Sequence, residues 1–129
     1  MVVEMQTLIS TARQITGIGA LSRDPKRMLT PIVRDPAGSE RLLVLRNYES
    51  IAIILNPDYY ESLLCSVGQL APTYVGTSVT DLHRRAKEIM EMVSEKGYTV
   101  RVDIDPTTKV VIVNVAKFEQ ILDRLEQKQ

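Results

Sequence analysis

The chain has 129 residues, 44% of them hydrophobic, which is enough for one small domain or for two halves that share a core and argues against wholesale disorder. Its 16 basic and 16 acidic side chains cancel, which argues against bulk electrostatic attraction to nucleic acid or to a membrane. No apolar run approaches the roughly 20 residues that cross a bilayer, so we expect a cytoplasmic protein without a membrane partner.

Residue types that carry catalysis are sparse. The single cysteine, Cys65, excludes an intrachain disulfide and a zinc site built from cysteines, and we expect it to be a buried packing residue. The single histidine, His83, falls on the charged flank of a predicted helix, which favours a solvated surface position. Because no Ser-His-Asp, Cys-His or metal-ligand arrangement emerges, the sequence predicts no enzyme, no metal site and no cofactor.

The first half, residues 1–67, is predicted to form a βααββα module. An edge strand is expected over 5–10, and a helix capped by Ser10 or Thr11 is expected to run to residue 22. The later predicted elements are a short helix over 23–29, a hairpin that turns at "DPAGS" (35–39), a central strand over 49–56, and a helix over 57–67 with Asn56 at its N-cap.

The second half is predicted to be a folded αββα unit over residues 81–129. Residues 68–80, with two glycines and a proline, are predicted to be a linker. After it come an amphipathic helix over 81–96 that ends at Gly97, strands over 98–104 and 109–114, and a C-terminal helix over 115–128. The predicted fold class is therefore α+β.

The pattern of residues 41–64 returns at residues 99–122. Asn56 corresponds to Asn114, while the position of Arg46 is taken by Ile104. Any strand-turn-strand-helix unit resembles another to a degree, but the matched Asn, aromatic and Glu positions favour an internal duplication. Two such halves would pack as the subunits of a dimer do, with their apolar strands in one sheet. The core residues expected there are Ile51, Ile53, Leu55, Val111 and Val113.

Two stretches, "MQTLISTARQI" and "LLVLRNYESIAIILNPDYYESLL", resemble the prevent-host-death (Phd/YefM) antitoxin family over about residues 5–65. The resemblance implies a homodimer that binds operator DNA as an autoregulatory repressor, and a toxin partner that the protein neutralises. It also implies that Arg13 and Arg46 contact DNA, together with their neighbours Gln14 and Asn47. The ordered pattern of residues 81–129 departs from that family, whose C-terminal tail folds on the toxin.

Two functions remain open at this stage. Apart from the resemblance, Arg13 and Arg46 are interpreted as solvated surface residues, and the basic residues at 23, 26, 27 and 34 as solvated loop charge. The first hypothesis is an antitoxin-type, DNA-binding transcriptional autoregulator. The second is a protein-protein interaction module with an antitoxin-like fold that does not bind DNA, which the neutral charge, the long segment between Arg13 and Arg46 and the ordered second half favour.

Overall fold

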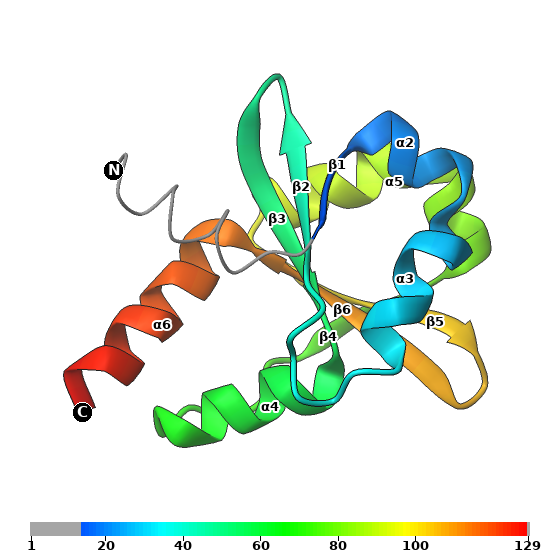
Figure 1. Ribbon diagram of the computed structural model, residues 1–129. Coiled ribbons are helices and arrows are strands. Elements are labelled where there is room, and N and C mark those ends of the chain that lie inside the picture. Colours follow the sequence, from blue (N-terminus) through cyan, green and yellow to red (C-terminus); the bar gives the residue numbers. More distant parts are fainter. Residues whose placement is uncertain (1–13, 129) are drawn as a thin grey trace.

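The computed structural model describes residues 14–128, which fold around one six-stranded mixed sheet (Figure 1). The first half contains β1 (Gln14–Gly17), α2 (Ile18–Arg23), α3 (Pro25–Val33), β2 (Leu42–Arg46), β3 (Glu49–Leu55) and α4 (Pro57–Ser66). The second half contains β4 (Tyr74–Ser78), α5 (Val79–Ser94), β5 (Thr99–Asp105), β6 (Thr108–Asn114) and α6 (Val115–Lys128). The protein is thus an α+β protein, as predicted. None of its described helices is long and apolar enough to cross a membrane.

The strand order is β1-β2-β3-β6-β5-β4. Each half therefore contributes its first strand to an edge, its second strand next to that edge and its third strand to the centre. In each half the edge strand runs parallel to its neighbour, β1 to β2 and β4 to β5, and that neighbour forms an antiparallel hairpin. The halves join where β3 and β6 pair antiparallel, with Ile53 opposite Val113 and Leu55 opposite Val111. The sheet therefore has an approximate two-fold axis between β3 and β6.

Helices cover both faces of this sheet (Figure 1). Helices α2, α3 and α5 lie on one face over a core that includes Leu21, Leu29, Leu82 and Met90. Helices α4 and α6 lie on the other face, where Phe118 is fully buried. Because both cores contain residues from both halves, the two halves form one folding unit.

The two-fold relation extends to the helices, because the strand pairing aligns residues 14–33 with residues 75–94 at an offset of 61 positions. The buried residues Leu21 and Leu29 correspond to the buried residues Leu82 and Met90. The break between α2 and α3 at Asp24 (φ −148°, ψ 67°) corresponds to a kink inside α5 at Arg85 (φ −133°, ψ 34°). The approximate two-fold relation therefore includes the helix break.

The apolar strands take the central place that the sequence predicted. Among the predicted core residues, Ile53, Leu55, Val111 and Val113 are fully buried, and Ile51 is 7% exposed. Their strands pair within a single chain, so the contact that two subunits of a dimer would make is already present in the monomer.

One prediction around the first helix was wrong within the described residues. Residues 14–17 form strand β1, where a helix from Ser10 or Thr11 to residue 22 was expected. Pairing with β2 overrides the local helix signal, since the Gln14 amide donates to the Arg41 carbonyl oxygen at 3.3 Å and Ile15 lies opposite Leu43. The strand predicted over 5–10 lies outside the described residues.

Two predicted connections were also wrong. The predicted linker, residues 68–80, contains β4, whose pairing with β5 makes the second half a βαββα unit. The predicted hairpin around "DPAGS" is a helix-to-strand connection after α3, in which the Asp35 carboxylate accepts hydrogen bonds from the amides of Ala37 and Glu40. The actual hairpin joins β2 to β3 through Asn47 and Tyr48, both with positive φ.

Candidate nucleic-acid interface

The two-fold axis reaches the surface between α2 and α5, where Ser22 and His83 contact each other reciprocally. The Ser22 hydroxyl donates to the His83 carbonyl oxygen at 2.7 Å, and His83 Nδ1 lies 2.6 Å from the Ser22 carbonyl oxygen. Because a carbonyl only accepts hydrogen bonds, Nδ1 carries the proton in this contact. Ser22 and His83 occupy corresponding positions of the two halves, so the axis passes between them.

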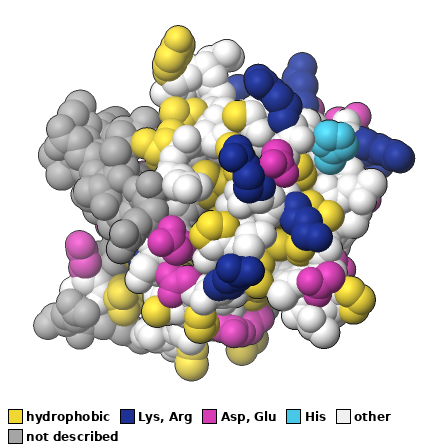
Figure 2. Space-filling model, turned by 45° about the vertical axis from the view of Figure 1, so that its right-hand side comes forward, with side chains coloured by type: hydrophobic (Ala, Val, Ile, Leu, Met, Phe, Trp, Pro, Cys, Tyr) yellow, Lys and Arg dark blue, Asp and Glu magenta, His cyan; other side chains and the backbone are white. Residues whose placement is uncertain are grey.

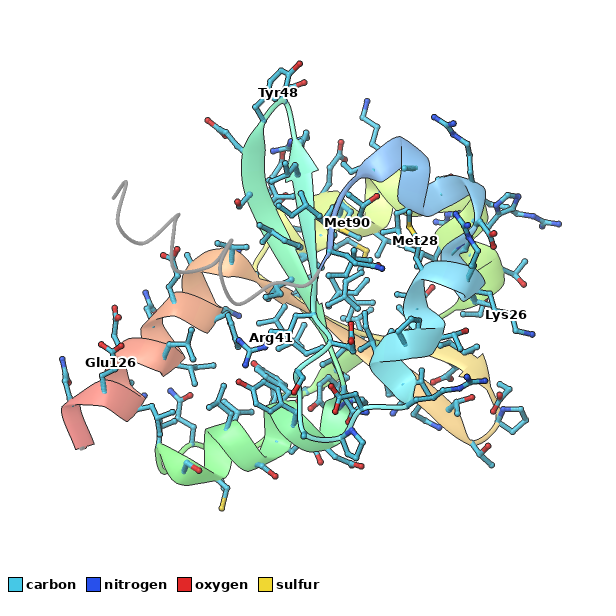
Figure 3. All side chains as sticks on the ribbon, in the orientation of Figure 1. Lys26, Met28, Arg41, Tyr48, Met90 and Glu126 are labelled. Atoms are coloured by element: carbon cyan, nitrogen blue, oxygen red, sulfur yellow. The ribbon has the colours of Figure 1, made fainter. Side chains whose placement is uncertain are left out.

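Four exposed cations surround this point as two related pairs. Arg23 corresponds to Arg84, and Lys26 corresponds to Lys87, at the same offset of 61 positions. All four side chains are exposed, and none lies within ion-pair distance of an acidic side chain in the described part of the chain. Lys26 points outward from α3 in Figure 3. We call Arg23, Lys26, Arg84 and Lys87 the dyad cations.

Acidic side chains are interleaved with this basic surface, as Figure 2 shows on the side of α2, α3 and α5. In the first half, Arg27 Nε lies 3.2 Å from a carboxylate oxygen of Asp24. In the second half, Arg85 Nε lies 3.1 Å from a carboxylate oxygen of Glu88. These two arginines are therefore partly neutralised, and the dyad cations carry the uncompensated positive charge of this surface.

This arrangement suits the binding of a polyanion. Guanidinium and ammonium groups bind phosphate oxygens, and Arg also pairs with the edge of guanine. Within the described residues, no three His, Cys, Asp or Glu side chains lie close enough together to hold a metal ion. Cys65 is exposed, which corrects the prediction that it is a packing residue.

The structure describes three of the four residues that the family resemblance assigned to DNA contact, and it places Gln14 apart from Arg46 and Asn47. Arg13 lies outside the described residues. Gln14 is exposed on the edge strand β1, opposite Leu42. Because Leu42 precedes Arg46 by four residues of β2, the backbones of Gln14 and Arg46 are about 13 Å apart along the sheet.

Arg46 and Asn47 lie together at the tip of the β2–β3 hairpin. Arg46 Nη1 lies 3.7 Å from a carboxylate oxygen of Glu95, and its side chain is 34% exposed. Asn47 is exposed in the turn with φ 51°, beside Tyr48, which is 95% exposed at the hairpin tip (Figure 3). The ion pair with Glu95 reduces the positive charge that Arg46 offers to a ligand.

The dyad cations were missed because Arg23 and Lys26 were interpreted as solvated loop charge. The signal that finds them is the offset of 61 positions, which places Arg23 on Arg84 and Lys26 on Lys87. Aligning the halves from the hairpin onward uses an offset of 58, and the three extra residues before Arg41 hide the match between the helices.

The opposite face of the sheet carries a groove between α4 and α6 with a volume of about 460 Å³. Its lining includes Tyr60, Leu70, Pro72 and Ile121. Leu70, at this groove, is 94% exposed. The groove is a second candidate surface, separate from the dyad cations.

No family model, curated protein or solved structure matches this chain.

Proposed function

We propose that this protein binds duplex DNA through the dyad cations, with one chain presenting the two-fold surface that DNA-binding homodimers build from two. The observation that carries the proposal is the correspondence of Arg23 with Arg84 and of Lys26 with Lys87, all four exposed and outside the ion pairs of the described chain. Symmetric DNA-binding proteins use such a pattern because the two-fold symmetry of the protein mirrors that of the operator.

The charge of the surface sets the strength of binding that we expect. Four phosphate contacts release about four counterions, so the slope of log K against log salt is about −3.6. The acidic residues Asp24 and Glu88 on the same face limit non-specific binding, as does a net charge of zero. Binding is therefore expected at low salt and is expected to weaken steeply toward physiological salt.

The finer role that we propose is an antitoxin-type transcriptional autoregulator that neutralises a partner toxin. It is supported by the resemblance of residues 5–65 to the prevent-host-death family and by the βααββα order of the elements in the first half. An operator would then lie upstream of the protein's own reading frame, and a toxin would be encoded next to it.

The test is fluorescence anisotropy with a labelled duplex from the upstream region, at low salt. We expect the double variant Arg23→Ala/Arg84→Ala to lose at least tenfold in affinity, since it removes two phosphate contacts. The matched control is Arg124→Ala/Lys109→Ala, which removes the same charge from α6 and β6 and is expected to bind as the wild type does. Equal affinities for the two double variants would contradict the assignment of the surface.

A second candidate function is that of a protein-interaction module, favoured by the groove between α4 and α6. Its exposed Leu70 suits an apolar side chain of a partner, and we take the product of the adjacent reading frame as that partner. Co-purification of that product with the wild type, and its loss with Leu70→Glu, would support this function. Retained co-purification with Leu70→Glu would count against the groove.

A further inference from the structure

The two halves differ next to the dyad cations, where an ion pair is conserved with its signs reversed. Asp24 corresponds to Arg85, and Arg27 corresponds to Glu88, at the offset of 61 positions. Each pair joins residues three positions apart, at 3.2 Å in the first half and 3.1 Å in the second. The four dyad cations are therefore related by the two-fold axis. The third cation of each half, Arg27 or Arg85, is not.

The reversal places the third arginine at a different position in each half. Arg85 lies two residues after His83 at the axis, whereas Arg27 lies five residues after the corresponding Ser22. Arg27 lies beyond the helix break at Asp24, whereas Arg85 lies at the corresponding kink of α5. The two arginines therefore take different positions relative to the axis.

The ion pairs leave both arginines able to reach a ligand. The Arg27 side chain is 78% exposed and that of Arg85 is 61% exposed. Exposed pairs of this kind hold their partners weakly, because water solvates both charges and the side chains lose rotamer entropy when they pair. A guanine edge, which accepts two hydrogen bonds from one guanidinium group, competes well with such a partner.

A single chain is sufficient to present both sets of cations. The antiparallel contact of β3 with β6 joins the two halves inside the chain, and both cores are shared between the halves. No second copy is needed to bring α2 and α5 together at the Ser22–His83 contact.

We propose that one chain occupies one duplex site, and that this site is an inverted repeat with unlike halves, one read by Arg27 and the other by Arg85 closer to the centre. The inference rests on the proposed DNA-binding function and specifies the symmetry of its target. An ordinary homodimer would read two identical half-sites. Because the two halves of this chain differ at Arg27 and Arg85, the protein would bind its site in one orientation only.

The experiment selects bound duplexes from a random pool, in parallel with the wild type and with Arg85→Asp/Glu88→Arg. This variant gives the second half the charges of the first, keeps the net charge and the ion pair, and places Asp where the first half already tolerates it at a helix break. We expect unlike half-sites for the wild type and alike half-sites for the variant. The preference of each protein for its own site should be about tenfold per altered base pair.

Native mass spectrometry of the wild type on its selected duplex should give one chain per duplex. Two chains per duplex, identical half-sites for the wild type, or the same unlike half-sites for the variant would each overturn the inference and leave DNA binding in place. Absence of any enriched duplex with the wild type would overturn both this inference and the proposed function.

Discussion

Asn56 and Asn114 make the same set of hydrogen bonds in the two halves of the chain. The Asn56 amide donates to the carbonyl oxygens of Ile32 and Val33 at the end of α3, while its side-chain oxygen accepts from the Asp58 amide at the start of α4. Asn114 donates in the same way to the last carbonyls of α5 and accepts from the Lys117 amide at the start of α6. Each asparagine therefore ties the end of one helix to the start of another across the sheet.

We expect Asn56→Ala to lower the free energy of unfolding by about 2–3 kcal/mol, because it removes an N-cap and leaves two carbonyls at a helix end without their donor. The same change at Asn114 should cost less, since this side chain is less buried. Urea denaturation followed by circular dichroism measures both changes.

Serine at the same two positions separates the two roles of the asparagine. Asn56→Ser keeps an N-cap acceptor and removes the amide donors, so its cost should lie between those of the wild type and Asn56→Ala. Gln120→Ala, on the exposed side of α6, serves as a neutral control and should change stability by less than about 0.5 kcal/mol. A cost for Asn56→Ala no larger than that of the control would contradict a stabilising role of these hydrogen bonds.

Arg41 shows where the two halves have diverged inside the fold, since Thr99 takes its place in the second half. Its Nε donates to the Gly38 carbonyl oxygen and its Nη2 to the Tyr59 hydroxyl, both at 2.7 Å. The guanidinium carbon lies 4.8 Å from the Tyr59 ring centre and 5.6 Å from that of Phe118 (Figure 3 labels Arg41).

We expect Arg41→Lys to destabilise the protein by about 1–2 kcal/mol despite the retained charge, because an ammonium group cannot stack and donate in this fork geometry. Thermal unfolding measures the loss. Arg124→Lys on exposed α6 is the matched control and should leave the melting temperature unchanged. A tolerated Arg41→Lys would show that packing alone, and not the planar group, holds this site.

The shared cores of the two halves predict that the halves assemble after separation. Cutting the chain after Gly68, in the connection between α4 and β4, leaves β3 and β6 whole. Co-expressed fragments 1–68 and 69–129 should co-purify as a one-to-one complex through a tag on either fragment, because each buries the other's apolar strand. Replacing Ile53 by Asp, which puts a charge at the fully buried pair with Val113, should abolish the complex. Fragments that purify separately as folded monomers would contradict the single core.

Tyr74 links β4 of the second half to α4 of the first, through a hydrogen bond of 3.3 Å from its hydroxyl to the Glu61 carboxylate. Burial, and after it the charge of Glu61, raise the pKa of Tyr74 above its ordinary value of 10.0. The Tyr74 phenol therefore ionises at lower pH in the unfolded chain than in the folded chain. The free energy of unfolding that the neutral phenol contributes is complete below pH 10 and is lost as the pH rises further.

We therefore expect Tyr74→Phe to lose less unfolding free energy than the wild type between about pH 9 and about pH 11. Urea unfolding at the two pH values measures this difference. Tyr48→Phe, at an exposed hairpin tip, should lose as much as the wild type. Parallel losses in the wild type and Tyr74→Phe would show that the phenol does not contribute.

The sequence predicted the elements whose own residues show a clear hydrophobic pattern. The runs at Ile53–Leu55 and Val111–Val113 are apolar throughout, so central strands and their mutual pairing followed, and Asn56 preceding a proline indicated the start of α4. Strands β1 and β4 lack such a pattern, since "QITG" and "YVGTS" are short and partly exposed. They become strands because β2 or β5, which lies far away in the sequence, supplies their hydrogen bonds. Local residue propensity does not depend on such a partner and so could not predict them.

The candidate surface was hidden for a related reason. Arg23 and Lys26 have no distinctive neighbours in the sequence. They form a symmetric basic surface only together with Arg84 and Lys87, which the fold brings to the other side of the two-fold axis. The predicted residues Arg46 and Asn47 lie at a hairpin tip, where Glu95 from the end of α5 lies within ion-pair distance of Arg46.

The salt dependence of DNA binding tests the central claim most directly. Affinity for one upstream duplex is measured by anisotropy over a series of salt concentrations, for the wild type and for Arg23→Ala/Arg84→Ala. We predict a slope of log K against log salt of about −3.6 for the wild type and about −1.8 for the variant. Absence of binding at low salt, or the same slope for both proteins, would contradict the claim that the dyad cations bind DNA.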